Sequence, residues 1–160
     1  MIDVRKIQLN ESVVVNERID IAMPGGWEPP LHATVAVFVV GRLVNTGRAF
    51  MLDAQAACRP VAACSRCLDD VAQDISFHIK EDFVEAELAT DEEIGFSDKT
   101  IDIFPAVQRN LFLNIPMKPL CAADCAGLCP RCGKNLNEGG CDCKGEINEQ
   151  FRQLLQYFDD

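Results

Sequence analysis

Residues 121–143 read CAADCAGLCPRCGKNLNEGGCDC and contain six of the nine cysteines of this 160-residue chain. Within this stretch, a Cys-x-x-Cys pair followed by glycine is joined by a short loop to a Cys-x-Cys pair. Two pairs at this spacing are typical of a tetrahedral metal site with thiolate ligands, because each pair directs two sulfurs at one point. The spacing predicts a main metal site with four ligands, Cys129, Cys132, Cys141 and Cys143.

The cysteine-rich region is poor in apolar side chains, so a bound metal is needed to keep it folded. Between residues 116 and 145 the sizeable apolar side chains are Met117, Leu120, Leu128 and Leu136. Ordering this region costs on the order of 1.5 kcal/mol per residue, whereas a structural zinc ion contributes roughly 10–16 kcal/mol. Four thiolates could also hold an iron–sulfur cluster, but the Cys-Pro-x-Cys-Gly turn favours zinc. Reduced, unligated thiols in a loop are the alternative.

Four further cysteines form two more pairs: Cys64, Cys67, Cys121 and Cys125. The first pair lies in a predicted turn between strands, and the second pair precedes the main site. Together they would complete a second Cys₄ site that joins the C-terminal module to the rest of the chain. The alternative is that these four are buried thiols or alternative ligands of one site. Cys58 stands alone and is expected to be a small core residue.

A Cys-x-x-Cys pair can also be a redox centre. Thioredoxin-type chemistry places such a pair at a helix N-terminus within a βαβ unit, which lowers the thiol pKa. The flanks of Cys64 and Cys67 look like strands instead. A thiol redox protein is therefore the third hypothesis for this chain.

Most of the chain before residue 100 has β-strand character. Strand-like segments lie at residues 13–15, 34–44, 48–63 and 71–85. The last of these alternates, with Ile75, Phe77 and Ile79 on one face and polar side chains on the other. Since no βαβ pattern is present, the sequence predicts an antiparallel meander of long strands.

Two helices are expected toward the C-terminus. Residues 102–114 have Asp102 as a cap and Pro105 in the first turn. Residues 146–160 carry an apolar stripe typical of an amphipathic helix. The predicted fold is α+β in three parts: a β-rich body ending in a helix (1–115), a zinc-binding module (116–145), and a C-terminal helix that packs back on the body (146–160).

The net charge of −10 argues against a large electrostatic footprint on nucleic acid, because phosphate binding depends on Lys and Arg. Residues 81–98 hold eight acidic residues and no basic one. We interpret them as a solvated loop or linker, with a docking strip for a basic partner as the alternative. The longest apolar run, residues 35–40, is too short to span a bilayer. A cytoplasmic location is expected, where clustered cysteines stay reduced.

Sequence motifs of common enzyme classes are absent. The chain contains no P-loop, GxSxG or GxGxxG pattern, and no acid/base pair stands out among its carboxylates. We therefore expect a protein that is not an enzyme.

Three stretches together resemble the YceD family, the large ribosomal RNA subunit accumulation protein family. They are CSRCL at 64–68, LFLNIPMKPLC at 111–121 and CAGLCPRCGKNLNEGGCDC at 125–143. The resemblance covers about residues 10–158. It implies an accessory factor for accumulation or processing of the large-subunit ribosomal RNA, with no known enzymatic activity and with zinc in a structural role.

The leading functional hypothesis is thus a non-enzymatic factor in ribosome assembly that acts by binding. A ribosomal or ribosome-assembly protein is the expected partner, because such proteins are basic and an acidic surface attracts them and repels bare RNA. Direct RNA contact is left open, and no membrane is implied. The alternative is a zinc-ribbon interaction module with a non-ribosomal partner.

Overall fold

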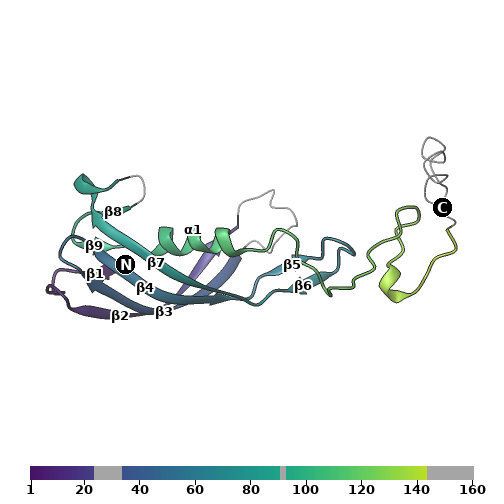
Figure 1. Cartoon of the computed structure of the whole chain (residues 1–160), viewed down its shortest axis with the longest axis horizontal. Helices are drawn as coiled ribbons and strands as arrows, with labels where there is room; N and C mark the ends of the chain where they lie inside the picture. The colour runs from purple at the N-terminus through teal and green to yellow at the C-terminus, as the bar shows by residue number, and fades with distance from the viewer. Residues whose placement is uncertain (24–33, 91–92, 144–160) are drawn as a thin grey trace, which may run out of the picture.

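The computed structural model describes residues 1–23, 34–90 and 93–143. Figure 1 shows an elongated molecule, with a β-rich body at one end and the cysteine-bearing segment extending beyond the other end. The predicted C-terminal helix at 146–160 lies outside the described residues, and the three-part division of the chain stays a prediction.

A five-stranded sheet forms the body. Its strands, in spatial order, are β2 (Ser12–Ala22), β3 (Thr34–Asn45), β4 (Phe50–Cys58), β7 (Ile75–Glu85) and β8 (Ile94–Phe96). The four long strands pair antiparallel, as the sequence predicted. The short β8 is an exception and pairs parallel with β7. The connection through the 3₁₀ turn η1 (Ala86–Leu88) brings the chain back to run in the same direction.

Two of the predicted strands are each divided in two. The segment at 48–63 breaks after β4 because Pro60 has no N–H to continue a sheet ladder. The chain resumes as β5 (Val61–Ala63), which pairs with β6 (Asp70–Ala72) before β7 begins. The resulting β5–β6 hairpin projects from the end of the sheet toward the cysteine-bearing segment (Figure 1).

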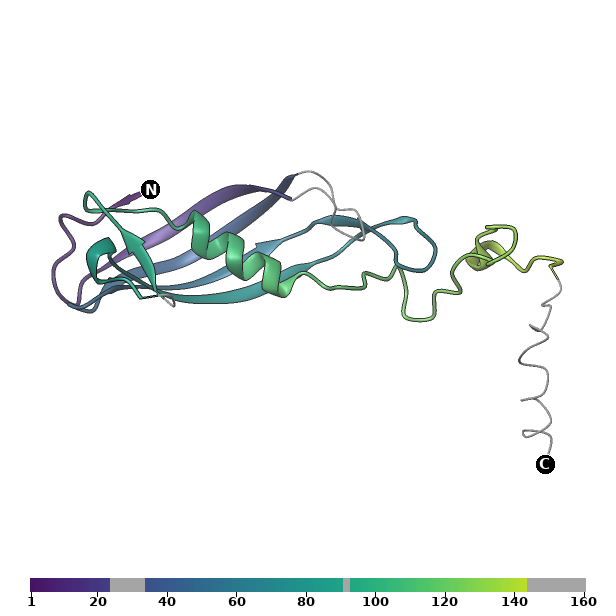
Figure 2. The ribbon, with the colours of Figure 1, turned by 90° about the horizontal axis from the view of Figure 1, so that it is seen from above.

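One α-helix covers one face of the sheet. Helix α1 (Phe104–Asn114) begins two residues later than predicted, and Asp102 Oδ1 accepts a hydrogen bond from the Phe104 N–H at 3.0 Å. Figure 2 shows α1 lying across the sheet. Val107 and Leu111 of α1 are fully buried against the inward side chains of the strands. The described residues hold one of the two expected helices, α1, and two 3₁₀ turns, η1 and η2 (Leu136–Glu138).

The core consists of the inward-facing side chains of the long strands and of α1. Its largest fully buried members on the long strands are Val15, Ile21, Val37, Val39, Leu43, Leu52, Ile79 and Phe83. A short ladder of β1 (Ile2–Asp3) and β9 (Thr100–Ile101) closes one end of this layer. Cys58 belongs to the core, as predicted. The opposite face of the sheet leaves Phe38 and Val40 more than half exposed.

The interpretation of residues 81–98 as a loop or linker is wrong for much of that range. Residues 81–85 belong to β7, in which Phe83 and Val84 are buried. Residues 94–96, near the end of the range, form β8. Three of its acids also pair with distant bases: Glu81 with Arg109, Glu85 with Lys99, and Glu93 with Arg48. These charges therefore contribute to tertiary contacts in the body.

Gly41 permits a close approach of β3 and β4, and its replacement tests this packing. It lies opposite Ala54, and an added Cβ would overlap the Asp53 carbonyl oxygen and the Ala54 Cα atom. We expect Gly41→Ala to lower the free energy of unfolding by about 1–3 kcal/mol, because backbone atoms must move. Urea unfolding measures this change. Gly140→Ala is the control, since its Cβ meets nothing within 4 Å; equal effects of the two changes would contradict the prediction.

Candidate metal centres

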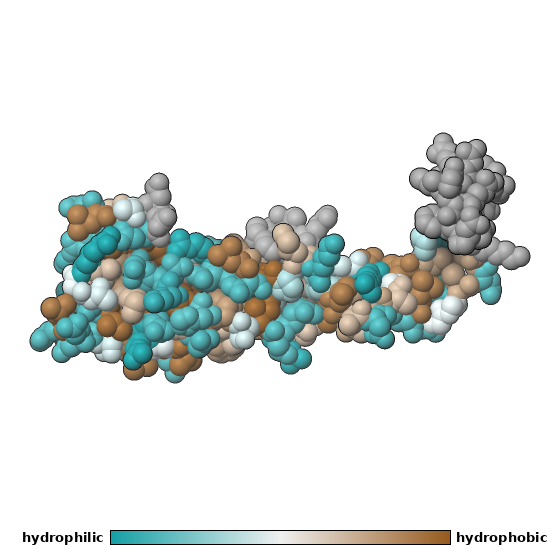
Figure 3. Space-filling model, viewed as in Figure 1, coloured by the Kyte–Doolittle hydropathy of each residue, from teal (hydrophilic) through white to brown (hydrophobic). Residues whose placement is uncertain are grey.

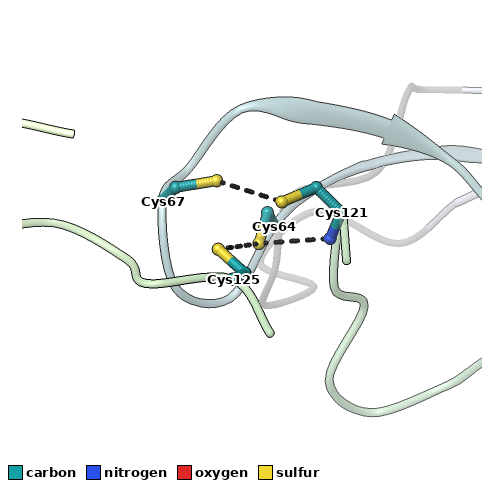
Figure 4. Close-up of side chains that lie close together, drawn as sticks. All are labelled: Cys64, Cys67, Cys121 and Cys125. Carbon is teal, nitrogen blue, oxygen red and sulfur yellow. Dashed lines mark hydrogen bonds between the residues drawn. The ribbon is translucent and has the colours of Figure 1, made fainter. Parts of the chain in front are cut away.

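The first cysteine quartet joins two distant parts of the chain. Cys64 and Cys67 lie at the tip of the β5–β6 hairpin, and Cys121 and Cys125 come from the segment after α1. All four sulfurs lie within 4.8 Å of one another. Figure 4 shows the four side chains gathered around one point. Three of the four side chains are buried, with Cys121 exposed. The structure thus brings together the four residues of the predicted second site.

The sulfur spacing fits a tetrahedral metal ion. Cys64 Sγ lies 3.9 Å from Cys125 Sγ, and Cys67 Sγ lies 3.6 Å from Cys121 Sγ. A tetrahedron with metal–sulfur bonds of about 2.3 Å has sulfur–sulfur edges of about 3.8 Å. A disulfide would need about 2.05 Å, and all nine cysteines are free thiols. The quartet therefore has the size of a Cys₄ metal site.

The second quartet consists of Cys129, Cys132, Cys141 and Cys143, the residues of the predicted main site. Their sulfurs also lie within 4.8 Å of one another. The surroundings differ, because Cys132 and Cys143 are exposed and only Cys129 is buried. Three of the four side chains of this quartet are thus at least partly exposed, whereas three of the four in the first quartet are buried.

Both Cys-x-x-Cys turns have the same backbone hydrogen bonds. In the second quartet, the Gly133 N–H donates to the Cys129 carbonyl at 2.9 Å, and the Arg131 N–H donates to Cys129 Sγ at 3.5 Å. In the first, the Leu68 N–H donates to the Cys64 carbonyl at 3.0 Å, and the Arg66 N–H donates to Cys64 Sγ at 3.5 Å. The two turns thus have the same backbone geometry, in which both could present two thiolates to a metal ion.

Leu68 occupies the position that glycine takes in the other Cys-x-x-Cys turn. Its φ is 65°, against 72° for Gly133. This left-handed conformation suits glycine and strains a branched side chain, at a cost on the order of 1–3 kcal/mol. Sequence reasoning missed the equivalence because the glycine that marks such a turn is absent after Cys67.

Backbone N–H groups lower the pKa of one cysteine thiol in each quartet, Cys129 and Cys64. The N–H groups of Cys132 and Arg131 lower the pKa of Cys129 to about 6. Burial raises the pKa of Cys64, but the N–H groups of Cys67, Arg66 and Cys121 outweigh it and lower the pKa to about 6. Conversely, the neighbouring Cys132 side chain raises the pKa of Cys143 to about 12. Metal binding there must displace a proton, which is the usual coupling of thiolate ligation to pH.

Asn137, in the loop of the second quartet, contacts a ligand of the first. Its Nδ2 donates to Cys125 Sγ at 3.4 Å, and its Oδ1 accepts from the Ala126 N–H at 2.7 Å. Such contacts to a ligand orient it and tune its affinity for the metal. The sequence placed Asn137 in a compact return loop, and nothing in its spacing pointed to Cys125.

Further hydrogen bonds hold the two quartets together as one unit. The Leu128 N–H donates to the Arg66 carbonyl at 3.1 Å, and the Leu136 N–H donates to the Gly127 carbonyl at 2.8 Å. Asn135 Nδ2 donates to Asp69 Oδ2 at 2.9 Å. The loop of the second quartet is therefore built directly on the hairpin tip that carries half of the first.

Comparison with known proteins identifies the family. The family model described as "Large ribosomal RNA subunit accumulation protein YceD" matches residues 52–156, a span that contains all eight cysteines of the quartets. The chain belongs to the YceD family. No solved structure matches it.

The relatives that this YceD-family chain matches are mostly longer. The uncharacterized protein Rv2926c of Mycobacterium tuberculosis is 33% identical over 121 residues, which cover 72% of this chain and 58% of the relative. The Arabidopsis thaliana protein named "Large ribosomal RNA subunit accumulation protein YCED homolog 1, chloroplastic" is 36% identical over 52 residues, or 32% of this chain and 16% of the relative. This chain therefore spans less than two thirds of the length of either relative.

Elemental analysis tests whether the quartets hold metal. We expect protein purified without added metal to contain two metal ions per chain. Cys64→Ser and Cys129→Ser should each remove one ion, because three remaining thiolates hold it less tightly. Cys58→Ala is the control and should keep both ions, since Cys58 lies in the core of the body. Metal-free protein with an ordered cysteine-bearing segment would contradict the prediction.

Replacing Asn137 tests the link between the quartets. We expect Asn137→Ala to weaken metal binding at the first quartet about 10–100-fold, the usual effect of losing a partner of a metal ligand. Metal transfer to a chromogenic chelator measures this in protein with both quartets intact, and the release phase that Cys64→Ser abolishes identifies the first quartet. The neighbouring exposed Glu138→Ala serves as the control. Equal release rates from the two variants would show that Asn137 has no such role.

Proposed function

We propose that this protein is a non-enzymatic accessory factor for accumulation of the large-subunit ribosomal RNA, and that it acts by binding. The observation that carries the proposal is the family match over residues 52–156, which includes both quartets. The name of the Arabidopsis relative describes the same role for that protein. We infer that each quartet holds a structural zinc ion, because zinc suits four thiolates at these sulfur–sulfur distances and the Cys-Pro-x-Cys-Gly turn.

The ligand set supports a structural role over a catalytic one. A catalytic zinc site keeps one position open for water or substrate, whereas four cysteines fill the tetrahedron. Outside the quartets, His78 lies on the exposed face of the sheet, with Nε2 at 2.8 Å from Asp53 Oδ1. A half-exposed contact of this kind between two polar side chains is an ordinary surface feature.

The distribution of charge favours a basic protein as the partner. Residues 1–115 contain 18 acidic and 10 basic side chains, whereas residues 116–143 contain three of each. Hydrophilic side chains cover most of the visible face of the body in Figure 3. A Cys₄ zinc site adds further negative charge, since its thiolates outnumber the charge of the ion. Such a surface attracts basic ribosomal or assembly proteins and repels bare RNA.

A deletion strain tests the proposed function. We expect loss of the protein to lower mature large-subunit ribosomal RNA relative to small-subunit RNA, with fewer large subunits in sucrose gradients. Wild-type protein and Cys58→Ala should restore the profile, whereas a variant with both Cys64→Ser and Cys129→Ser should not, because both metal sites are lost. Normal RNA ratios in the deletion strain would refute the assignment and favour a non-ribosomal partner for the metal-binding module.

A further inference from the structure

The two edges of the five-stranded sheet differ sharply. β8 is three residues long, and η1 packs beside it. β2 has 11 residues and pairs with β3 at every one of them without a bulge. Figure 1 shows β2 along the margin of the sheet. None of the described strands pairs with its outer edge.

The outer edge of β2 lacks proline, lysine and a bulge, three of the features that discourage strand pairing, although it carries the charged residues Glu17, Arg18 and Asp20. Native proteins protect an edge strand with proline, lysine, a bulge or a covering segment, or they keep the strand short. β2 contains neither proline nor lysine and is rich in β-branched residues. A regular edge of this length is suited to pairing with another extended strand.

The charges on β2 are complementary to those of a second β2. Arg18 and Asp20 point to the exposed face of the sheet, on either side of the half-buried Ile19, and they pair with each other at 3.1 Å. In an antiparallel pair of identical strands centred on Ile19, Arg18 faces Asp20 of the second copy. Symmetry produces this ion pair twice.

Other central positions give poorer pairing. A two-fold axis at Glu17 places two glutamates opposite each other, and an axis at Arg18 does the same with two arginines. Like charges directly opposite are destabilising. An axis at Asn16 leaves Arg18 opposite Val14 of the second copy. With the axis at Ile19, no like charges face each other, and the Ile19 side chains meet on the face that buries Ile21.

We propose that the protein forms a homodimer in which two copies of β2 pair antiparallel about Ile19. The sheet then continues through both copies. The interface is isologous and closed, because only the short β8 edges remain at the two ends. Since the strands run roughly along the long axis of the molecule (Figures 1 and 2), the two metal modules lie at opposite ends of the dimer. This interface uses neither quartet and is independent of the proposed function.

The test is sedimentation equilibrium of the full metal-loaded chain over a range of concentrations. We expect wild-type protein to show a concentration-dependent dimer. Arg18→Asp and Asp20→Arg should each weaken it by roughly tenfold or more, because each replaces two attractive cross-strand pairs with two repulsive ones. Arg5→Asp is the control, since it breaks a comparable exposed pair with Asp3 outside β2. Circular dichroism and metal content verify that every variant is folded.

Mixing the two weakened variants isolates the predicted register. The Arg18→Asp copy presents two aspartates and the Asp20→Arg copy two arginines, so an equimolar mixture should associate more tightly than either variant alone. The double variant R18D/D20R should also recover dimerisation. A wild-type protein that stays monomeric at all concentrations would overturn the proposal. A mixture that fails to associate, or single variants that dimerise as wild type does, would overturn it equally.

Discussion

The juxtaposition of four sulfurs at the tip of the β5–β6 hairpin fixes where the C-terminal part of the described chain lies. Cys125 and Cys121 reach ligand partners 61 and 54 residues earlier in the sequence. Around them, the apolar contribution is small and consists of Val71, Leu120 and Leu128. Backbone hydrogen bonds also join the hairpin to the segment after α1, including one from the Ser65 N–H to the Pro119 carbonyl at 2.9 Å. Because packing is so limited, a metal ion would be the main source of cohesion between the hairpin and this segment.

The hairpin can carry this site because it leaves the sheet. Pro60 ends the β4 ladder, and the pairing resumes as a short, separate ladder of β5 and β6. The metal centres therefore stand beyond the core of the body. The β-rich body at one end has an excess of acidic side chains, whereas residues 116–143 at the other end hold equal numbers of acidic and basic side chains.

Sequence patterns predicted the parts of this structure that local chemistry determines. The alternation at 75–79 and the absence of a βαβ pattern predicted the long antiparallel strands, and cysteine spacing predicted the grouping of the second quartet. Non-local effects were harder to predict. The parallel β8 and the ion pairs of Glu81, Glu85 and Glu93 depend on contacts between residues far apart in sequence, which single-sequence periodicity does not encode. The left-handed backbone of Leu68 was not predicted, because the Cys-x-x-Cys turn imposes this conformation and leucine by itself disfavours it.

The different sequence spans of the two quartets have a consequence for synthesis of the chain. The ligands of the second quartet lie within 15 consecutive residues, 129–143, and emerge from a ribosome almost together. Those of the first quartet emerge in two groups. Cys64 and Cys67 of the hairpin lack their two partner cysteines until Cys121 and Cys125 have been synthesised. During that interval Cys64 and Cys67 are an incomplete thiol pair, open to oxidation or to the wrong partner. The nascent chain is therefore most vulnerable after its sheet has been made and before residues 121–125 have been synthesised.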